Sequence, residues 1–510
     1  MARQISKRIK IMGTVTAQTP LHVGGLGTDP TVDLSLAVDG QNRSYIPGTS
    51  LAGAFRNWME DCGLDINSIW GYQEEDKGHT RKEDKGHASF IMIEDAVVTL
   101  PDGAIAELRD HVGINRVLGS ASDKTKFDRA ILPKGSCFQL KMTIDVAQAK
   151  PIALNSVEQL IDVLRKDGLR LGAAKTRGLG LIKLTDLEWL EYDLSSFSGM
   201  VAALKKSGTP YTPTAVCSSR LLHLSIYWKP IGALMVKSGQ DGVSVDILPL
   251  VSRDKNQVAF VLPGSAVKGA MRSQAERILR TVLRLDANYA DKLQDQLEGS
   301  SLELVHWLFG KSGTGDKTEK VGFGRGALTV DDCFCEKKLD PENWQAVEQA
   351  TDDPQAPGTL RGSLDAAGLT ETQQAFHVAI DRWTGGAADQ MLYSALEPFK
   401  LAWEPIELSL DLERIEEPQR GAVQALLFLT LRDLALGRIP LGYGVNRGYG
   451  SLLVQKIVLK AAMPEMNDKE ITFSQQGEIN GINLADLDQS WRTWLQQAES
   501  QIAQSQEVAR

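Results

Sequence analysis

The chain of 510 residues is acidic overall, with a formal net charge of −9, and its 42% hydrophobic and 24% charged residues are typical of a folded globular protein. It contains no run near the roughly 18 apolar residues of a membrane-spanning helix, and its basic start, MARQISKRIK, precedes no apolar stretch of signal-peptide length, which argues against secretion. The five cysteines form no C-x-x-C pair, so we expect neither a disulfide framework nor a zinc site, and a reducing cytoplasm is the simplest setting.

The negative charge is concentrated in two segments. Residues 340–371 hold seven acids and one base, and the Gln-rich tail 461–510 holds eight acids and three bases. Without these segments the rest of the chain has a net charge of +2. A local basic surface for RNA therefore remains possible, because the local field matters more than net charge. We expect the acidic tail to lie off any RNA path.

The chain repeats itself, which predicts two modules of one fold. Five pairs of strings recur in the same order: IPGTSLAGAFR at 46–56 with LPGSAVKGAMR at 262–272, VDL at 32–34 with VDI at 245–247, SIWG at 68–71 with WLFG at 307–310, HVGINR at 111–116 with HVAIDR at 377–382, and LGAAKTRGLG at 171–180 with LGYGVNRGYG at 441–450. A linker rich in Ser, Gly, Pro and Thr at 195–219 places the boundary near residue 205. The first module then covers 1–205 and the second 206–460, with the acidic insertion, before the tail 461–510.

The sequence patterns of the two modules predict the same secondary-structure elements in the same chain order. In the first module we expect a strand, a helix, strands, a long hairpin-like region, a helix and a final strand: 10–17, 49–59, 89–98, 111–145, 157–166 and the residues after 180. In the second module the corresponding segments are 222–228, 265–271, 326–334, 377–412, 422–436 and the residues after 450. This order predicts an α+β, ferredoxin-like fold, which is frequent among RNA-binding proteins. A short helix is expected from residue 484.

The P-G-[ST] turn before the first helix of each module is a candidate phosphate site. Thr49 or Ser50 in the first module, and Ser265 in the second, are expected to cap the helix. The N-terminus of a helix presents free N–H groups and a positive dipole to an anion. Arg56 and Arg272 occupy matching positions about two turns later. The alternative is a capped amphipathic helix with a solvated arginine.

Two further repeated positions are candidates for RNA contact. Arg177 and Arg447 stand in R-G-x-G turns, whose glycines allow another chain to approach closely, or which simply form tight turns before a strand. His111 and His377 begin the hairpin regions and either contact RNA or close a strand end.

Asp33 and Asp246 are the matched carboxylates of the two modules, each after a Val in an extended segment. RNA is cleaved when a 2′-hydroxyl attacks the neighbouring phosphorus, which requires in-line geometry and help from a base or a metal ion. One carboxylate beside a kinked RNA is sufficient for slow cleavage. Alternatively, each Asp is a surface or capping residue.

These motifs together resemble the RAMP superfamily of CRISPR-associated proteins, and within it the family-7 backbone subunits of type III effectors. The resemblance covers about 10–185 and 222–455, and the fused pair is similar to the double-module subunit of type III-D systems. It implies two tandem ferredoxin-like (RRM-like) RAMP modules, each with a protruding β-hairpin thumb, within 112–138 and 378–406.

The resemblance also implies a metal-dependent endoribonuclease that binds a guide RNA and cuts complementary target RNA once per module. Asp33 and Asp246 match the cutting Asp, which acts with a divalent ion, Mg or Mn. RNA contacts are expected from Thr49, Ser50, Arg56, His111, Arg116, Arg177, Ser265, Lys268, Arg272, His377, Arg382 and Arg447. Ala52 stands where the pattern has a Lys. The implied partners are guide CRISPR RNA, single-stranded target RNA, further RAMP proteins and the large polymerase-like subunit.

Two other functions stay open at this point. One is a non-catalytic scaffold of the same complex, in which both Asp residues are structural. The other is a guide-processing endoribonuclease of the same superfamily, although two thumb-bearing modules suit such an enzyme poorly.

Overall fold

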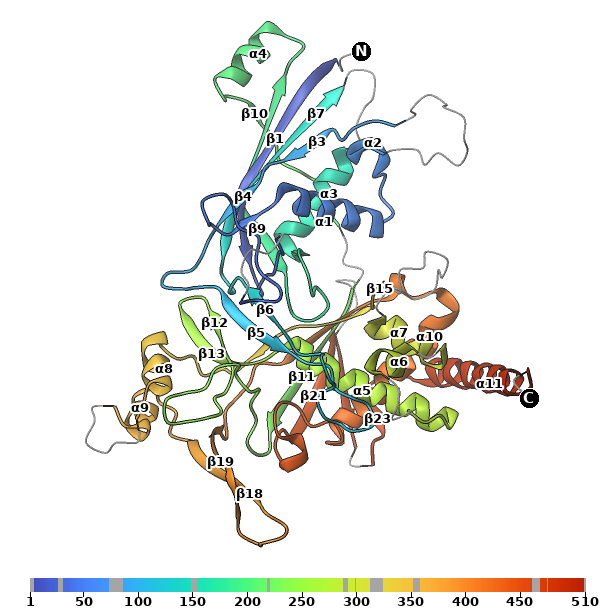
Figure 1. Ribbon diagram of the computed structural model, residues 1–510. Helices are drawn as coiled ribbons and strands as arrows, with labels where there is room; N and C mark the ends of the chain where they lie inside the picture. The colour runs from blue at the N-terminus through green and yellow to red at the C-terminus, as the bar shows by residue number, and fades with distance from the viewer. Residues whose placement is uncertain are drawn as a thin grey trace. The chain divides into compact units, whose positions relative to one another are not determined.

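The computed structural model divides into two compact units (Figure 1). Unit 1 comprises Met1–Glu107, Ala130–Lys175 and Leu179–Ser218, and unit 2 comprises Leu108–Arg129, Thr176–Gly178 and Ser219–Arg510. The structure describes residues 4–25, 31–72, 86–147, 154–217, 221–287, 292–298, 300–311, 324–351, 358–460, 468–474 and 476–508. Residues 108–129 thus come from the middle of the first sequence module, but by their contacts they belong to unit 2, which contains the second module.

Unit 1 has the ferredoxin-like strand order in an antiparallel sheet. Its core elements are β1 (Ile5–Ala17), α1 (Gly48–Asp61), β3 (Ile91–Ile93), β4 (Ala96–Thr99), β7 (Cys137–Ala147), α3 (Leu154–Lys166) and β9 (Leu181–Asp193). The sheet runs β9–β1–β7, with β3 and β4 pairing the far side of β7. Side chains alternate along β1, so that Ile9, Ile11 and Val15 enter the core. The helical face that contains Leu51 and Phe55 is buried as predicted.

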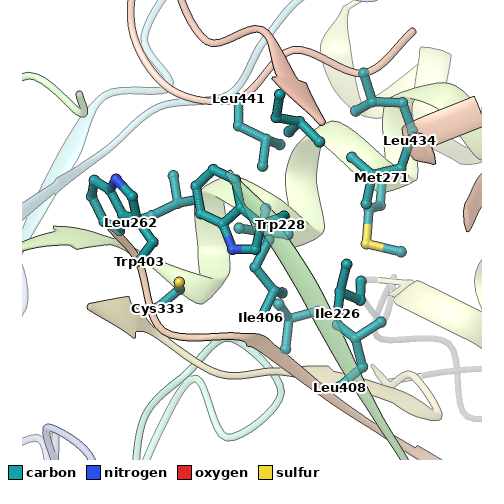
Figure 2. Close-up of a cluster of buried hydrophobic side chains, with 14 of the residues drawn as sticks. Ile226, Trp228, Leu262, Met271, Cys333, Trp403, Ile406, Leu408, Leu434 and Leu441 are labelled. Carbon is teal, nitrogen blue, oxygen red and sulfur yellow. The ribbon is translucent and has the colours of Figure 1, made fainter. Parts of the chain in front are cut away.

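Unit 2 repeats this order. Its core elements are β11 (Leu221–Pro230), α5 (Gly264–Leu283), β16 (Leu328–Val330), β20 (Ile406–Asp411), α10 (Glu417–Ala435) and β21 (Leu452–Lys460). The sheet runs β16–β20–β11–β21. Figure 2 shows Trp228 of β11 and Met271 of α5 within one buried cluster, together with Leu434 of α10. The predicted α+β fold with two ferredoxin-like modules is confirmed.

A hairpin is inserted between the second and third core strands of each module. In the first module β5 (Glu107–His111) pairs β6 (Phe127–Ile131), and in the second β18 (Thr372–Ile380) pairs β19 (Ala387–Pro398). These hairpins occupy the regions in which the resemblance implies thumbs.

The predicted side-chain caps of α1 and α5 are wrong. The N-cap residues are prolines, and no side chain of the first turn caps either helix. Instead the Gly48 N–H donates to Asp95 (2.7 Å) and the Gly264 N–H donates to Asp332 (2.8 Å). A carboxylate stabilises the positive end of a helix, and here it comes from a segment far along the chain, which local sequence rules do not detect.

The acidic tail and the acidic insertion are both folded parts of unit 2. The tail adds β22 (Lys469–Phe473) and β23 (Ile479–Asn480) to the sheet. The expected short helix is α11 (Ala485–Val508), 24 residues long, whose apolar side chains contact the core beside α10. In the insertion, α8 (Pro341–Glu348) and α9 (Leu360–Ala366) bury their apolar faces in the same core. The acidic residues of the tail and of the insertion thus belong to segments that pack on the core of unit 2.

Within the described residues, no helix has the length and apolarity needed to cross a membrane.

The packing of α11 predicts a stability effect. Trp494 is only 8% exposed, whereas Arg492 on the same helix is exposed and pairs with Asp488. We expect Trp494→Ala to lower the free energy of unfolding by about 3 kcal/mol, because it removes a large buried ring, and Arg492→Ala to change it by less than about 0.5 kcal/mol. Guanidinium denaturation of the whole chain measures both. Equal midpoints for Trp494→Ala and the wild type would show that α11 is not part of the core.

Candidate nucleic-acid interface

Asp33 and Asp246 are exposed and occupy the same place relative to their hairpins. The carbonyl of Leu34, next to Asp33, accepts the N–H of Ala130 in β6 (3.0 Å). The carbonyl of Ile247, next to Asp246, accepts the N–H of Leu396 in β19 (2.9 Å). The backbone next to each Asp is therefore held beside the base of its own hairpin.

Asp246 is also braced by the hairpin itself. Its Oδ2 accepts the N–H of Ser394 (2.7 Å) and the Ser394 hydroxyl (3.0 Å). The Asp246 N–H in turn lies 3.1 Å from the Ser394 hydroxyl oxygen. The brace fixes the orientation of the carboxylate, and Oδ1 takes no part in these bonds.

The base of the first hairpin carries a cluster of basic side chains within unit 2, called the cation cluster below because most of its members are arginine or lysine. Its members are Arg109, His111, Arg129, Arg177 and Lys268. Within the described residues, only Arg109 of this set forms an ion pair with a carboxylate, a buried pair with Asp332 at 2.5 Å. The cluster therefore has more cations than anions.

Arg129 is the least satisfied member. Its side chain is 6% exposed, and its Nε and Nη1 have no hydrogen-bond partner within the described part of the chain. Its guanidinium lies 5.9 Å from the ring centre of Phe127. Burial, and then the charge of Arg177, lower the pKa of Arg129 to about 10. Unpaired buried donors are costly, and an anion at this place would satisfy them.

The neighbours of Arg129 have lowered pKa values, chiefly because they are buried. Burial, and then the charges of Arg129, Arg177 and Arg109, lower the pKa of His111 to about 4, so that His111 is neutral at neutral pH. Its ring stacks on Phe127 at 5.0 Å, and its Nε2 has no partner among the described residues. Burial lowers the pKa of Arg177 as well, although its side chain is exposed.

Lys268 completes the cluster from the first turns of α5. Its Nζ donates to the carbonyl of Leu328 (2.6 Å). Burial lowers its pKa well below the usual range, and the charge of Arg177 adds to this effect. The R-G-x-G turn of the first module and the P-G-S helix of the second, which the sequence singled out separately, thus share one electrostatic site.

The base of the second hairpin is built differently. His377 stacks on Tyr393 (5.2 Å), and its Nε2 lies 3.1 Å from both Glu397 and the Tyr449 hydroxyl. The Tyr449 hydroxyl donates to Glu397. Arg447 is exposed and lies over the rings of Tyr443 and Tyr393. The group combines possible proton donors and acceptors with aromatic faces.

Two predicted arginines have partners inside unit 2. Arg116 and Arg272 both pair with Glu276, at 2.5 and 2.8 Å, and the Glu276 side chain is only 2% exposed. Arg272 also donates to the carbonyl of Gly310 (2.9 Å). Both arginines thus organise α5, whereas Arg382 is exposed.

The small polar residues in the first turns of α1 and α5 differ in their exposure to solvent. Thr49 is exposed, while Ser50 and Ser265 are half-buried, and Arg56 is half-buried further along α1. None of these residues belongs to the cation cluster.

Comparison of the repeats missed Arg109 and Arg129. When the two hairpins are aligned, Arg109 corresponds to Ala375 and Arg129 corresponds to Ala395 in the second module. Neither arginine is therefore repeated in the second module. Arg109 stands two residues before the repeated His111, but only the folded contacts distinguish it from a surface strand residue.

Within the described residues, no three or more His, Cys, Asp or Glu side chains gather closely enough to hold a metal ion.

Residues 14–183 and 234–453 match the family model described as RAMPs, the RAMP superfamily. The chain belongs to the RAMP superfamily. The two matched regions correspond to the two repeats, so this is a two-module RAMP protein, and membership implies a CRISPR-associated RNA-binding subunit. No curated protein matches the chain.

The buried His111 predicts a pH effect on stability. Its folded pKa of about 4 lies below the unfolded value of about 6.5. The unfolded state therefore binds more protons between these values, and stability is lost as the pH falls through this window. We expect the wild type to lose about 1 kcal/mol more than His111→Phe between about pH 7 and pH 5.5. Phe keeps the stacking on Phe127, and parallel pH dependences in urea denaturation would contradict the assignment.

Proposed function

We propose that this RAMP protein is a backbone subunit of a type III CRISPR ribonucleoprotein effector, in the fused double-module form of type III-D, and serves antiviral defence. It holds guide RNA and presents complementary target RNA to two cutting sites. The observation that carries its RNA-binding role is the buried Arg129 guanidinium, whose Nε and Nη1 have no hydrogen-bond partner within the described residues and lie in a cluster with excess positive charge.

A guide phosphate is the anion that this cluster lacks. The oxygens of a phosphodiester would accept hydrogen bonds from Arg129 and Arg177, and its negative charge would offset the repulsion between the two guanidinium groups. Hydrogen bonds between arginine and phosphate are among the strongest hydrogen bonds in proteins. Ribose-phosphate contacts of this kind hold RNA without reading its sequence, as a guide of variable sequence requires. The remaining predicted contacts, including Thr49, Ser265 and Arg447, extend the same role.

Target cleavage is assigned to Asp33 and Asp246. The backbone next to each Asp lies beside a hairpin base, where a hairpin wedged between bases would turn the RNA backbone toward in-line geometry. The carboxylate then orients the 2′-hydroxyl and accepts its proton as the oxygen attacks phosphorus and the bond to the 5′-oxygen breaks. A Mg or Mn ion, bound by this carboxylate together with RNA phosphate oxygens, would neutralise charge at the phosphate.

A scaffold role without cleavage is the second candidate. The Ser394 brace occupies one oxygen of Asp246, as expected of a carboxylate that fixes a loop onto a hairpin. A guide-processing nuclease is the third, favoured by the His377, Tyr449 and Glu397 group. Incubation of the chain with precursor guide RNA alone tests this third function.

Guide binding predicts a change in salt dependence. Arg177→Ala should flatten the slope of log affinity against log salt by about 0.7, the single-strand value for one phosphate contact. Filter binding of labelled guide RNA over a salt series measures the slope. The control is Arg361→Ala, which removes an exposed cation from α9. Arg177 is preferred to Arg272, whose loss would also disturb Glu276. Identical slopes for Arg177→Ala and Arg361→Ala would exclude the contact.

Two cutting sites predict separable products. Asp33→Ala should remove one band of end-labelled target cut by the assembled complex, and Asp246→Ala another, because modules in series along the RNA cannot share a phosphate. Target binding should persist, since neither carboxylate attracts phosphate. Asp241→Ala is the matched control, since it removes an exposed acid five residues before Asp246.

The outcomes of this gel distinguish the candidates. A wild-type ladder from the double variant would make both residues structural and favour the scaffold. Loss of every band in one single variant would show that the sites are coupled. Chelation of divalent ions should stop both cuts, and persistence of either cut would remove the ion from that site.

A further inference from the structure

A pocket with a volume of about 460 Å³ lies along the second half of α5 (Figure 1) and is lined by four arginines. Arg277, Arg280 and Arg284, called the three α5 arginines below, share one face of the helix because they are spaced by three and four residues. Arg116 from the tip of the first hairpin is the fourth. Every lining residue belongs to unit 2, so the pocket is formed within one compact unit.

The arginines of this pocket outnumber its carboxylates. Glu276 and Asp286 are the acidic residues of the lining, so four arginines and two carboxylates give it a net charge of +2. Glu276 already pairs with both Arg116 and Arg272. Within the described residues, the three α5 arginines form no ion pair with a carboxylate. Like charges three or four residues apart on a helix repel one another, and an anion in the pocket would offset this repulsion.

Arg280 shapes the pocket and has one unused donor. Its Nη1 donates to the carbonyl of Asp286 (3.2 Å), and its Nη2 donates to the carbonyl of Gln296 (2.6 Å). Its Nε is buried and has no hydrogen-bond partner within the described residues. Arg280 thus fixes the chain that follows α5, whereas Arg277 and Arg284 are exposed and can reach a ligand.

The backbone of Arg284 indicates a role beyond ending the helix. Arg284 is the C-cap of α5 and has the left-handed conformation, with φ +56°. Glycine is the usual residue in this conformation at the end of a helix, because a Cβ strains it. Local backbone strain of this kind is concentrated at functional sites. Glycine would be sufficient here if the residue only ended the helix.

The charge and the size of the pocket favour a polyphosphate over the backbone of RNA. Each phosphodiester of RNA has a single negative charge, whereas one phosphate monoester has a charge of about −1.5 to −2, and a chain of phosphates has more. Arginine binds two phosphate oxygens at once, so three arginines within about two helical turns can hold several phosphates. Ligand pockets have volumes of roughly 300–1,000 Å³, and this pocket falls within that range.

We propose that this pocket binds a polyphosphate ligand, such as a nucleoside triphosphate, through Arg277 and Arg284. The site is separate from the proposed guide site, because Lys268 of the cation cluster is twelve residues from Arg280, or about 18 Å along α5. It requires no RNA and is independent of the proposed guide binding and cleavage. Since Arg116 also lines the pocket, a bound ligand adds contacts between the first hairpin and α5 and stabilises unit 2.

The test is isothermal titration calorimetry of the whole RNA-free chain with ATP and with inorganic tripolyphosphate, at constant ionic strength. Both probes should bind, because the phosphates provide the recognition. Arg277→Ala and Arg284→Gly should each weaken binding by at least about tenfold, since each removes charge-assisted hydrogen bonds. Arg361→Ala, which removes an exposed cation from α9, should bind both probes as the wild type does.

Two further measurements separate the ligand site from other roles of these residues. Arg284→Gly should leave the thermal midpoint of the ligand-free chain at least as high as that of the wild type, because glycine adopts the left-handed conformation without strain. Arg277→Ala should bind guide RNA as the wild type does in filter binding. Both variants change exposed side chains, so circular dichroism should show unchanged folding.

Three results would overturn the proposal. One is a wild-type chain that binds neither ATP nor tripolyphosphate. Another is an equal loss of affinity in Arg277→Ala, Arg284→Gly and Arg361→Ala, which would show general attraction to a basic surface. The third is a weakened affinity of Arg277→Ala for guide RNA, which would assign the pocket to the RNA path.

Discussion

The buried pair between Arg109 and Asp332 is the contact on which the arrangement of unit 2 depends. Asp332 caps α5 through the Gly264 N–H and has a fully buried side chain. A carboxylate so far from water is tolerated only with hydrogen bonds and a countercharge. Arg109 supplies both, and it comes from the first hairpin. This requirement explains why 108–129 belongs to the unit that contains the second module.

The same contact produces the cation cluster. The segment that contains Arg109 also brings His111 and Arg129 toward Lys268 and Arg177, but within the described residues the cluster forms no ion pair with a second carboxylate. Basic side chains in this cluster are therefore buried and repel one another, which lowers the pKa values of His111 and Arg129. Natural proteins accept such local cost where a ligand relieves it, which is the physical basis of the proposed guide site.

The two modules share a backbone and differ in chemistry at their hairpin bases. The first base is cationic, while the second joins His377, Glu397 and Tyr449 in a hydrogen-bonded group. The Asp residues keep the same register beside both hairpins. The position of the carboxylate is therefore the same in both modules, whereas the surrounding side chains differ.

The sequence by itself determined the repeat, the order of strands and helices, the two hairpins and the matched positions of Asp33 and Asp246, because alternation, helical periodicity and repeated turn motifs are local signals. Only the tertiary structure decided which residues meet. Asp95 and Asp332 replaced the expected caps, and two buried nitrogens of Arg129 have no hydrogen-bond partner within the described residues. The acidic tail became part of a core. Burial and charge pairing depend on contacts between distant segments, which no local pattern encodes.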